Sequence, residues 1–138
     1  MISDEIQLPR KLTNQLLHFA QLSPDLEICG LISSKNGIAS RCYPIRNCAE
    51  LPQKYFLLDA KEQISAMTEM RTLGEDFFAI YHSHPTAPAL PSDTDLELDT
   101  YPEVIHLIIS LNTKGILEMR GFKISKKSAV ELLLKMND

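Results

Sequence analysis

Two nearly continuous apolar segments place the strongest constraint on how this chain can fold. Residues 77–81 read Phe-Phe-Ala-Ile-Tyr, and residues 104–111 depart from apolar character only at His106 and Ser110. A strand with one solvated face alternates polar and apolar residues, whereas a strand covered on both faces stays apolar along its length. Both segments therefore predict buried strands in a sheet that is covered on both sides.

Helical patterns and a hairpin account for most of the first half of the chain. Apolar residues recur at helical spacing over residues 9–22 and 60–73, and a Pro or a Gly follows each pattern. Residues 28–33 and 38–45 predict two strands, because the intervening Asn36-Gly37 favours a tight turn. The first half is thus expected to contain two helices and a hairpin.

Weaker patterns cover the remaining segments. Residues 55–58 and 116–124 predict further strands, the latter preceded by a turn at residues 112–115. Ser92 predicts the N-cap of a helix, and residues 125–136 predict a final helix that begins at a serine cap. Helices then alternate with strands, which indicates an α/β (α+β) fold in which helices cover both sides of a mixed sheet. The strand order is not evident from the sequence.

Length and charge limit the classes of protein. A chain of 138 residues without an internal repeat or linker fits a single domain over residues 1–138. With 14 basic against 18 acidic residues and no basic stripe, nucleic acid is not an expected partner. No leader pattern or membrane-length apolar segment is evident. Three cysteines without a Cys-x-x-Cys pair argue against a disulfide framework, so we expect a cytoplasmic protein.

The chemistry of the chain is concentrated after the apolar segment 77–81. His82 and His84 follow it at a spacing that places both imidazoles on one face of a strand, roughly 6–7 Å apart. A catalytic zinc site needs three protein ligands and an open position for water. Asp95 is expected in the first turn of the helix that Ser92 caps. It is the natural third ligand, because the proline-rich loop between His84 and Ser92 can fold back.

Each half of this pattern has an ordinary structural explanation. A His-x-His at a strand end is often coincidental, and the serine and aspartate three residues apart resemble a helix cap. The combination is much rarer than either half. Metal-assisted hydrolysis also needs a proton acceptor outside the ligand set, and Glu27, which precedes Ile28-Cys29-Gly30-Leu31, is the best candidate.

Taken together, these residues resemble the JAMM or MPN+ metalloproteases, in particular the small stand-alone bacterial members. The family motif is a distant Glu, then His-x-His-Pro, a spacer and Ser-x-x-Asp. The matching positions are Glu27, His82-Ser83-His84-Pro85, Ser92 and Asp95, with the family-like surroundings Glu-x-Cys-Gly-Leu at residues 27–31 and Pro44-x-x-Asn47. The resemblance covers nearly the whole chain.

The resemblance implies an MPN domain with a cytidine-deaminase-like fold and one zinc ion bound by His82, His84 and Asp95, with water as fourth ligand. It implies that Glu27 polarises that water and that Ser92 hydrogen-bonds the tetrahedral oxyanion. The implied substrate is a peptide or isopeptide bond next to the C-terminal tail of a ubiquitin-fold protein. Because the chain has no room for ubiquitin-gripping insertions, a small sulfur-carrier protein with an extended tail is expected.

Two other functional classes compete with this one. A non-catalytic MPN-type scaffold or metal-binding interaction domain would share the fold, although such proteins typically lose motif residues and none is lost here. A zinc nucleobase deaminase needs His-x-Glu and Pro-Cys-x-x-Cys, and the chain contains neither. Cys29, His18 and His106 are expected to pack rather than react. The pathway of the carrier protein and the oligomeric state do not follow from the sequence.

Overall fold

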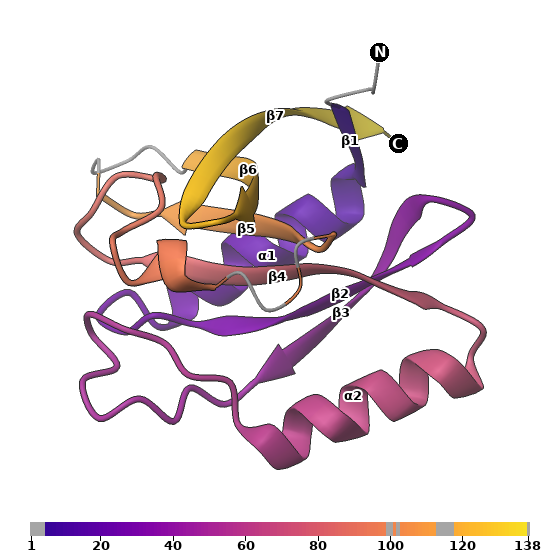
Figure 1. Ribbon diagram of the computed structural model, residues 1–138, viewed down its shortest axis with the longest axis horizontal. Helices are drawn as coiled ribbons and strands as arrows, with labels where there is room; N and C mark the ends of the chain where they lie inside the picture. The colour runs from indigo at the N-terminus through magenta and orange to yellow at the C-terminus, as the bar shows by residue number, and fades with distance from the viewer. Residues whose placement is uncertain (1–4, 99–100, 102, 113–117, 138) are drawn as a thin grey trace.

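A seven-stranded mixed sheet forms the centre of the molecule (Figure 1). The computed structural model describes residues 5–98, 101, 103–112 and 118–137. The elements in chain order are β1 (Glu5–Pro9), α1 (Arg10–Leu22), β2 (Cys29–Lys35), β3 (Ile38–Ile45), α2 (Ala60–Thr72), β4 (Asp76–His84), the 3-10 turn η1 (Asp95–Glu97), β5 (Ile105–Ser110), β6 (Glu118–Ser125) and β7 (Ser128–Asn137). None of the described helices is long and apolar enough to span a bilayer.

The strands are ordered β1-β7-β6-β5-β4-β2-β3. The β4–β5 and β1–β7 pairs are parallel, and all other neighbours are antiparallel. The two edge strands β1 and β3 contact one another, so the sheet curves nearly into a barrel. The expectation of a mixed, curved sheet is therefore confirmed.

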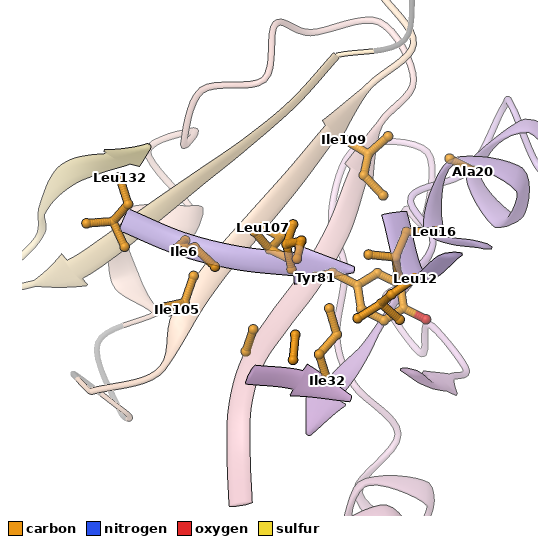
Figure 2. Packing of buried hydrophobic residues seen from close by; sticks show 13 residues of the cluster. Ile6, Leu12, Leu16, Ala20, Ile32, Tyr81, Ile105, Leu107, Ile109 and Leu132 are labelled. Carbon is orange, nitrogen blue, oxygen red and sulfur yellow. The ribbon is translucent and has the colours of Figure 1, made fainter. Parts of the chain in front are cut away.

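Helix α1 covers one face of the sheet. Its buried residues Leu12, Leu16 and Ala20 pack against Tyr81 of β4 and Ile109 of β5 (Figure 2). The helix begins at Arg10, directly after the extended Pro9 at its N-cap, and ends before Ser23-Pro24. This face of the sheet is an apolar core.

Helix α2 covers the opposite face, where Ala66 and Met70 pack against Leu31 and Ile80. Because side chains alternate along a strand, Ile80 of β4 faces α2 while its neighbour Tyr81 faces α1. The sheet is thus covered by helices on both sides, as the two apolar segments predict.

The boundaries of α2 follow from its capping residues. The Asp59 carboxylate accepts a hydrogen bond from the Glu62 N–H at 3.0 Å. At the other end Gly74 has a φ of 72°, and the Glu75 N–H donates to the Met70 carbonyl at 2.8 Å. This is the Schellman arrangement that glycine favours, so the predicted end of the helix is confirmed.

The predicted C-terminal helix is wrong. Residues 128–137 form β7, which lies between β6 and β1 and is joined to β6 by a two-residue turn at Lys126 and Lys127. Both lysines have left-handed backbone conformations, with φ of 51° and 59°. Sheet pairing on two sides thus overrides the helix propensity of the Glu-Leu-Leu-Leu-Lys-Met sequence.

Two further predictions need correction, and one strand was not expected. Residues 55–58 are not a strand, because only Leu58 forms a single bridge, to Asn47. The helix expected after Ser92 is one 3-10 turn, η1, since no apolar helical stripe follows it. Strand β1 carries too short a pattern to be recognised. The predicted turn at 112–115 and the start of the strand at 116 fall largely outside the described residues.

Candidate metal centre

The end of β4 delivers two histidines to the α2 side of the sheet. His82 and His84 point to the same face as Ile80, and both are buried between β2 and β5. His82 pairs with Ile108 of β5, and His84 with Ser110. Since β4 is an interior strand, the two imidazoles occupy a fixed register on a rigid element.

The loop after β4 folds back over the sheet and brings Asp95 to the histidines. Ala89 in this loop is fully buried against Ile108 and Phe122. The Ser110 hydroxyl donates to the Ala87 carbonyl at 2.7 Å, which fastens the loop to the end of β5. The predicted meeting of strand end and Asp95 is thus what the structure shows, although the aspartate comes from a 3-10 turn.

The three side chains form a nearly equilateral triangle of potential ligand atoms. His82 Nε2 and His84 Nε2 lie 3.1 Å apart, and each lies 3.1 Å from Asp95 Oδ2. A tetrahedral zinc ion with ligand bonds of about 2.0–2.1 Å would have ligands roughly 3.3 Å apart. The triangle therefore has the size of one face of a zinc tetrahedron.

The hydrogen bonds of His84 place its second ring nitrogen among electron-rich neighbours. Its Nδ1–H donates to the Pro88 carbonyl at 2.8 Å, so in the neutral ring Nε2 is an acceptor that faces a carboxylate oxygen and another imidazole nitrogen. Hydrogen bonds to Asp95 and Pro88 outweigh burial and raise the pKa of His84, so this position favours a positive charge. A divalent cation bound here would supply such a charge.

The pKa values of His82 and Asp95, the other two residues of the triangle, favour a neutral imidazole and an ionised carboxylate. Burial lowers the pKa of His82, which favours the neutral ring that binds metals. Burial would raise the pKa of Asp95, but hydrogen bonds from His82 and His84 hold it well below its usual range. The carboxylate thus stays ionised beside the two imidazoles.

Glu27 lies beside this triangle, in the connection between α1 and β2. It is buried, and ligand atoms of Glu27, His82 and His84 all lie within 4.8 Å of one another. Burial raises the pKa of Glu27 to about 8, as expected for a carboxyl group whose charged form has lost its water. Its buried position beside the two histidines fits a proton acceptor at a metal site better than a surface carboxylate.

Ser83, which the sequence did not single out, ties Glu27 to β4. Its side chain lies on the opposite face from the histidines, and its Oγ accepts a hydrogen bond from the Ile28 N–H at 2.9 Å. The same hydroxyl donates to the Leu26 carbonyl at 3.4 Å. The residues on both sides of Glu27 are therefore bound to the residue between the two histidines.

Ser92 and Asp95 bind one another reciprocally. The Ser92 N–H donates to Asp95 Oδ2, and the Asp95 N–H donates to Ser92 Oγ, each at 3.0 Å. Ser92 thus makes the capping interaction that its sequence position predicts, although the helix is a single turn. Because Oγ is an acceptor here, the hydroxyl hydrogen stays available to a ligand.

The remaining candidate residues have structural surroundings. The buried Cys29 thiol donates to the Ile45 carbonyl, and burial raises its pKa to about 12, so it is a poor nucleophile. His106 is buried, and burial lowers its pKa to about 4. All three cysteines are free. Cys29 and His106 thus pack as expected.

A buried His-His-Asp triangle with an adjacent carboxylate lies at the end of an interior strand, an arrangement typical of metal-dependent hydrolases. Over residues 9–122 the chain matches the family described as prokaryotic homologs of the JAB domain. The chain belongs to this family. The resemblance seen in the sequence is therefore confirmed.

Curated relatives and solved structures agree with this assignment. The CysO-cysteine peptidase of Mycobacterium tuberculosis is 30% identical over 87% of this chain and 83% of its own length. A desampylase of Haloferax volcanii is 32% identical, and the match spans 63% of this chain and 64% of that protein. A solution structure of a Desulfitobacterium hafniense protein superposes with a TM-score of 0.85 at 31% identity, covering 96% of this chain and 93% of the other.

The wider fold family is recognisable as well. A JAB1/MPN domain protein from Archaeoglobus fulgidus superposes with a TM-score of 0.63 at 19% identity, covering 96% of this chain and 97% of that one. At this identity the likeness concerns the fold alone. The expected MPN-type fold is therefore confirmed.

Proposed function

We propose that this chain is a zinc-dependent peptidase or isopeptidase that acts as a single domain. It hydrolyses a peptide bond after the C-terminal tail of a small ubiquitin-fold protein of the sulfur-carrier kind. The observation that carries the proposal is the triangle formed by His82, His84 and Asp95, in which three potential ligand atoms lie 3.1 Å from one another. Such a donor set fits one zinc ion.

In this proposal His82, His84 and Asp95 would hold one zinc ion, with a water as the fourth ligand. When bound, zinc supplies an acidified water and an electrophile that polarises the scissile carbonyl. Glu27 takes the proton of the attacking water, because its carboxylate lies next to the histidines in a buried position. The same carboxyl group then passes the proton to the leaving amine.

Ser92 contributes to stabilising the transition state. Its Oγ already accepts a hydrogen bond from the Asp95 N–H, which fixes the direction of the hydroxyl group. The remaining O–H hydrogen donates to the oxyanion that develops when water adds to the carbonyl. A preoriented donor of this kind is worth about 10²–10³-fold in kcat in other hydrolases.

The substrate class rests on the relatives. They are named CysO-cysteine peptidase and desampylase, and a Thermus thermophilus relative is named a probable TtuB-protein conjugate cleaving protease. We take their shared substrate to be a ubiquitin-like carrier protein with a group attached at its C-terminus. The three free cysteines suit a reducing compartment, and we propose that the enzyme works in the cytoplasm.

The test is to incubate the zinc-loaded protein with ubiquitin-fold sulfur carriers extended past their C-terminal residue, and to follow intact mass. We expect loss of the extension, about 10²–10⁴-fold slower with Glu27→Gln than with wild type. Glu27→Gln should still bind zinc, and Glu50→Gln, an exposed acid, serves as the matched control. No mass loss with any of several carriers would favour the non-catalytic scaffold instead.

A further inference from the structure

The side-chain amide of Asn47, just after β3, uses its full hydrogen-bonding capacity. Its Nδ2 donates to the carbonyls of Glu27 and Tyr55, both at 2.9 Å. Its Oδ1 accepts from the N–H groups of Ala49 at 2.9 Å and Leu57 at 3.0 Å. An amide offers two donor hydrogens and two lone pairs, so all four are used here. Asn47 is thus the hub of the connection between β3 and α2.

This connection also holds the other backbone group of Glu27. The Glu27 N–H donates to the Pro52 carbonyl at 2.8 Å, while its carbonyl accepts from Asn47. Both polar backbone groups of the proposed base are therefore bound by residues 46–59. The position of the Glu27 carboxylate depends directly on the shape of this connection.

The same connection places an aromatic ring on one of the two histidines. Phe56 lies between Tyr55 and Leu57, whose backbones Asn47 binds. It stacks on His82 with ring centroids 4.3 Å apart and an interplanar angle of 20°. Metal-binding imidazoles are usually oriented by a hydrogen bond from their second nitrogen. His84 has such a bond to Pro88, whereas His82 Nδ1 has no hydrogen-bond partner among the described residues. The stacked ring orients His82 in its place.

We propose that Asn47 is a positioning residue that fixes Glu27 and, through Phe56, the ring of His82. The inference rests on the proposed function, because it assigns a purpose to residues around the same site. One amide then couples the proton acceptor to a metal ligand across two segments far apart in sequence. Neither Asn47 nor Phe56 needs to touch the substrate.

The expected effects are those of misplacing a catalytic group while the fold persists. Displacing a reacting group by about 1 Å can lower the rate about 10²-fold, and removing an outer partner of a ligand typically lowers metal affinity or activity by about 10–100-fold. Because Ser83 also holds the Glu27 segment, we expect the lower part of this range, about 10-fold in kcat, for Asn47→Ala.

The decisive variants separate the two branches of the network. Asn47→Ala should lower kcat about 10-fold and leave KM within about 2-fold, because it moves the base rather than the substrate. Phe56→Leu should weaken zinc binding, measured by chelator competition with zinc alone, about 10-fold, whereas Phe56→Tyr, which keeps the stacked ring, should restore it. Asn47→Asp keeps both accepted hydrogen bonds and loses both donated ones, so it should behave like Asn47→Ala.

Two controls separate positioning from a general loss of stability. Asn14→Ala removes an exposed amide from α1, and Ile6→Val trims the apolar core under α1, on the opposite face of the sheet from the histidines. Both should keep the kcat and zinc affinity of the wild type, even though Ile6→Val lowers the melting temperature. If Asn47→Ala does not fold, Asn47→Asp decides the outcome.

The inference and the proposed function fail in different ways. A wild-type protein that binds zinc but cleaves no carrier overturns the proposed function, and the zinc affinities of the Phe56 variants still test the positioning of His82. The inference is overturned if the wild-type protein is active and the Asn47 variants fold with the same kcat and zinc affinity as the wild type. Equal zinc affinities for Phe56→Leu and Phe56→Tyr would also overturn it.

Discussion

The fold leaves no room for a side chain at Gly30, and Gly30→Ala tests the packing beside the site. Gly30 lies in β2 between Pro44 of β3 and Tyr81 of β4. A Cβ atom there would lie 2.5 Å from the Tyr43 carbonyl oxygen and 2.5 Å from Tyr81 Cε2, and closer still to the Tyr81 hydroxyl. These distances lie far inside van der Waals contact.

The size of the effect follows from which atoms can move. Tyr81 is buried, and the Tyr43 carbonyl belongs to a paired strand, so neither can give way without disturbing packing or the β2–β3 ladder. Overpacking of this kind costs about 1–3 kcal/mol or more, and we expect the upper part of the range. Replacing glycine also lowers the entropy of the unfolded chain, which offsets about 0.4–1 kcal/mol. The net loss should be about 2 kcal/mol.

Gly121→Ala in β6 is the matched control. Its Cβ would lie 2.7 Å from Ile6 Cδ1 and 2.9 Å from Leu134 Cδ2, which are the tips of side chains and can rotate away. Both variants make the same chemical change in a strand, so the difference reports the immobility of the neighbouring atoms. We expect Gly121→Ala to cost less than about 1 kcal/mol.

Urea unfolding, followed by circular dichroism in the presence of a chelator, measures the free energy of unfolding of both variants without a contribution from metal binding. About 2 kcal/mol corresponds to a melting temperature roughly 8 °C lower in a chain of this size. A Gly30→Ala protein as stable as wild type, or no less stable than Gly121→Ala, would refute the steric reasoning.

Three further predictions concern metal, pH and the last hairpin. Zinc at about 100 times its dissociation constant should raise the free energy of unfolding by about 2.7 kcal/mol, and His84→Ala should abolish this rise in a thermal scan. Hydrogen bonds from Tyr43 and Arg41 outweigh burial and lower the pKa of Glu75 from 4.5. The ionised Glu75 therefore stabilises the fold above pH 4.5, and this stabilisation is lost as the pH falls through the folded-state pKa. In urea unfolding, the loss of stability caused by Glu75→Gln should be large at pH 7 and shrink toward pH 3. Combining Lys126→Asn with Lys127→Gly, where both φ angles are positive, should raise the free energy of unfolding by roughly 1 kcal/mol or more, and unchanged stability would contradict a strained turn.

Much of the fold could be predicted because its local signals agree with its tertiary structure. The hairpin of β2 and β3 has an Asn36-Gly37 turn with positive φ at both residues, and α2 ends at a glycine with positive φ. In β7 the local sequence pattern and the tertiary structure disagree. Leu133 and Met136 are exposed there, so neither a helical stripe nor strand alternation marks the segment clearly. Its conformation is decided by pairing with β1 and β6, which the local sequence does not encode.

The sequence likewise predicts the proposed ligands of the site but not the contacts that position them. His82, His84 and Asp95 carry their chemistry in their side chains, and their spacing predicts that they meet. The residues around them act through backbone groups: Asn47 binds the Glu27 carbonyl, and His84 donates to the Pro88 carbonyl. Asn47 belongs to the family-like Pro44-x-x-Asn47 pattern, but every residue has a backbone carbonyl, so the sequence does not reveal which one Asn47 or His84 binds.

The alternation of side chains along β4 explains why the residue between the histidines matters. A shift of one residue in the register of β4 would turn His82 and His84 into the apolar core under α1 and bring Ser83 to the site. Ser83 opposes such a shift, because its hydroxyl binds the segment around Glu27 from the α1 side. The hydrogen bond that positions the proposed base therefore also fixes the register that presents the proposed ligands, so a change at Ser83 should disturb both together.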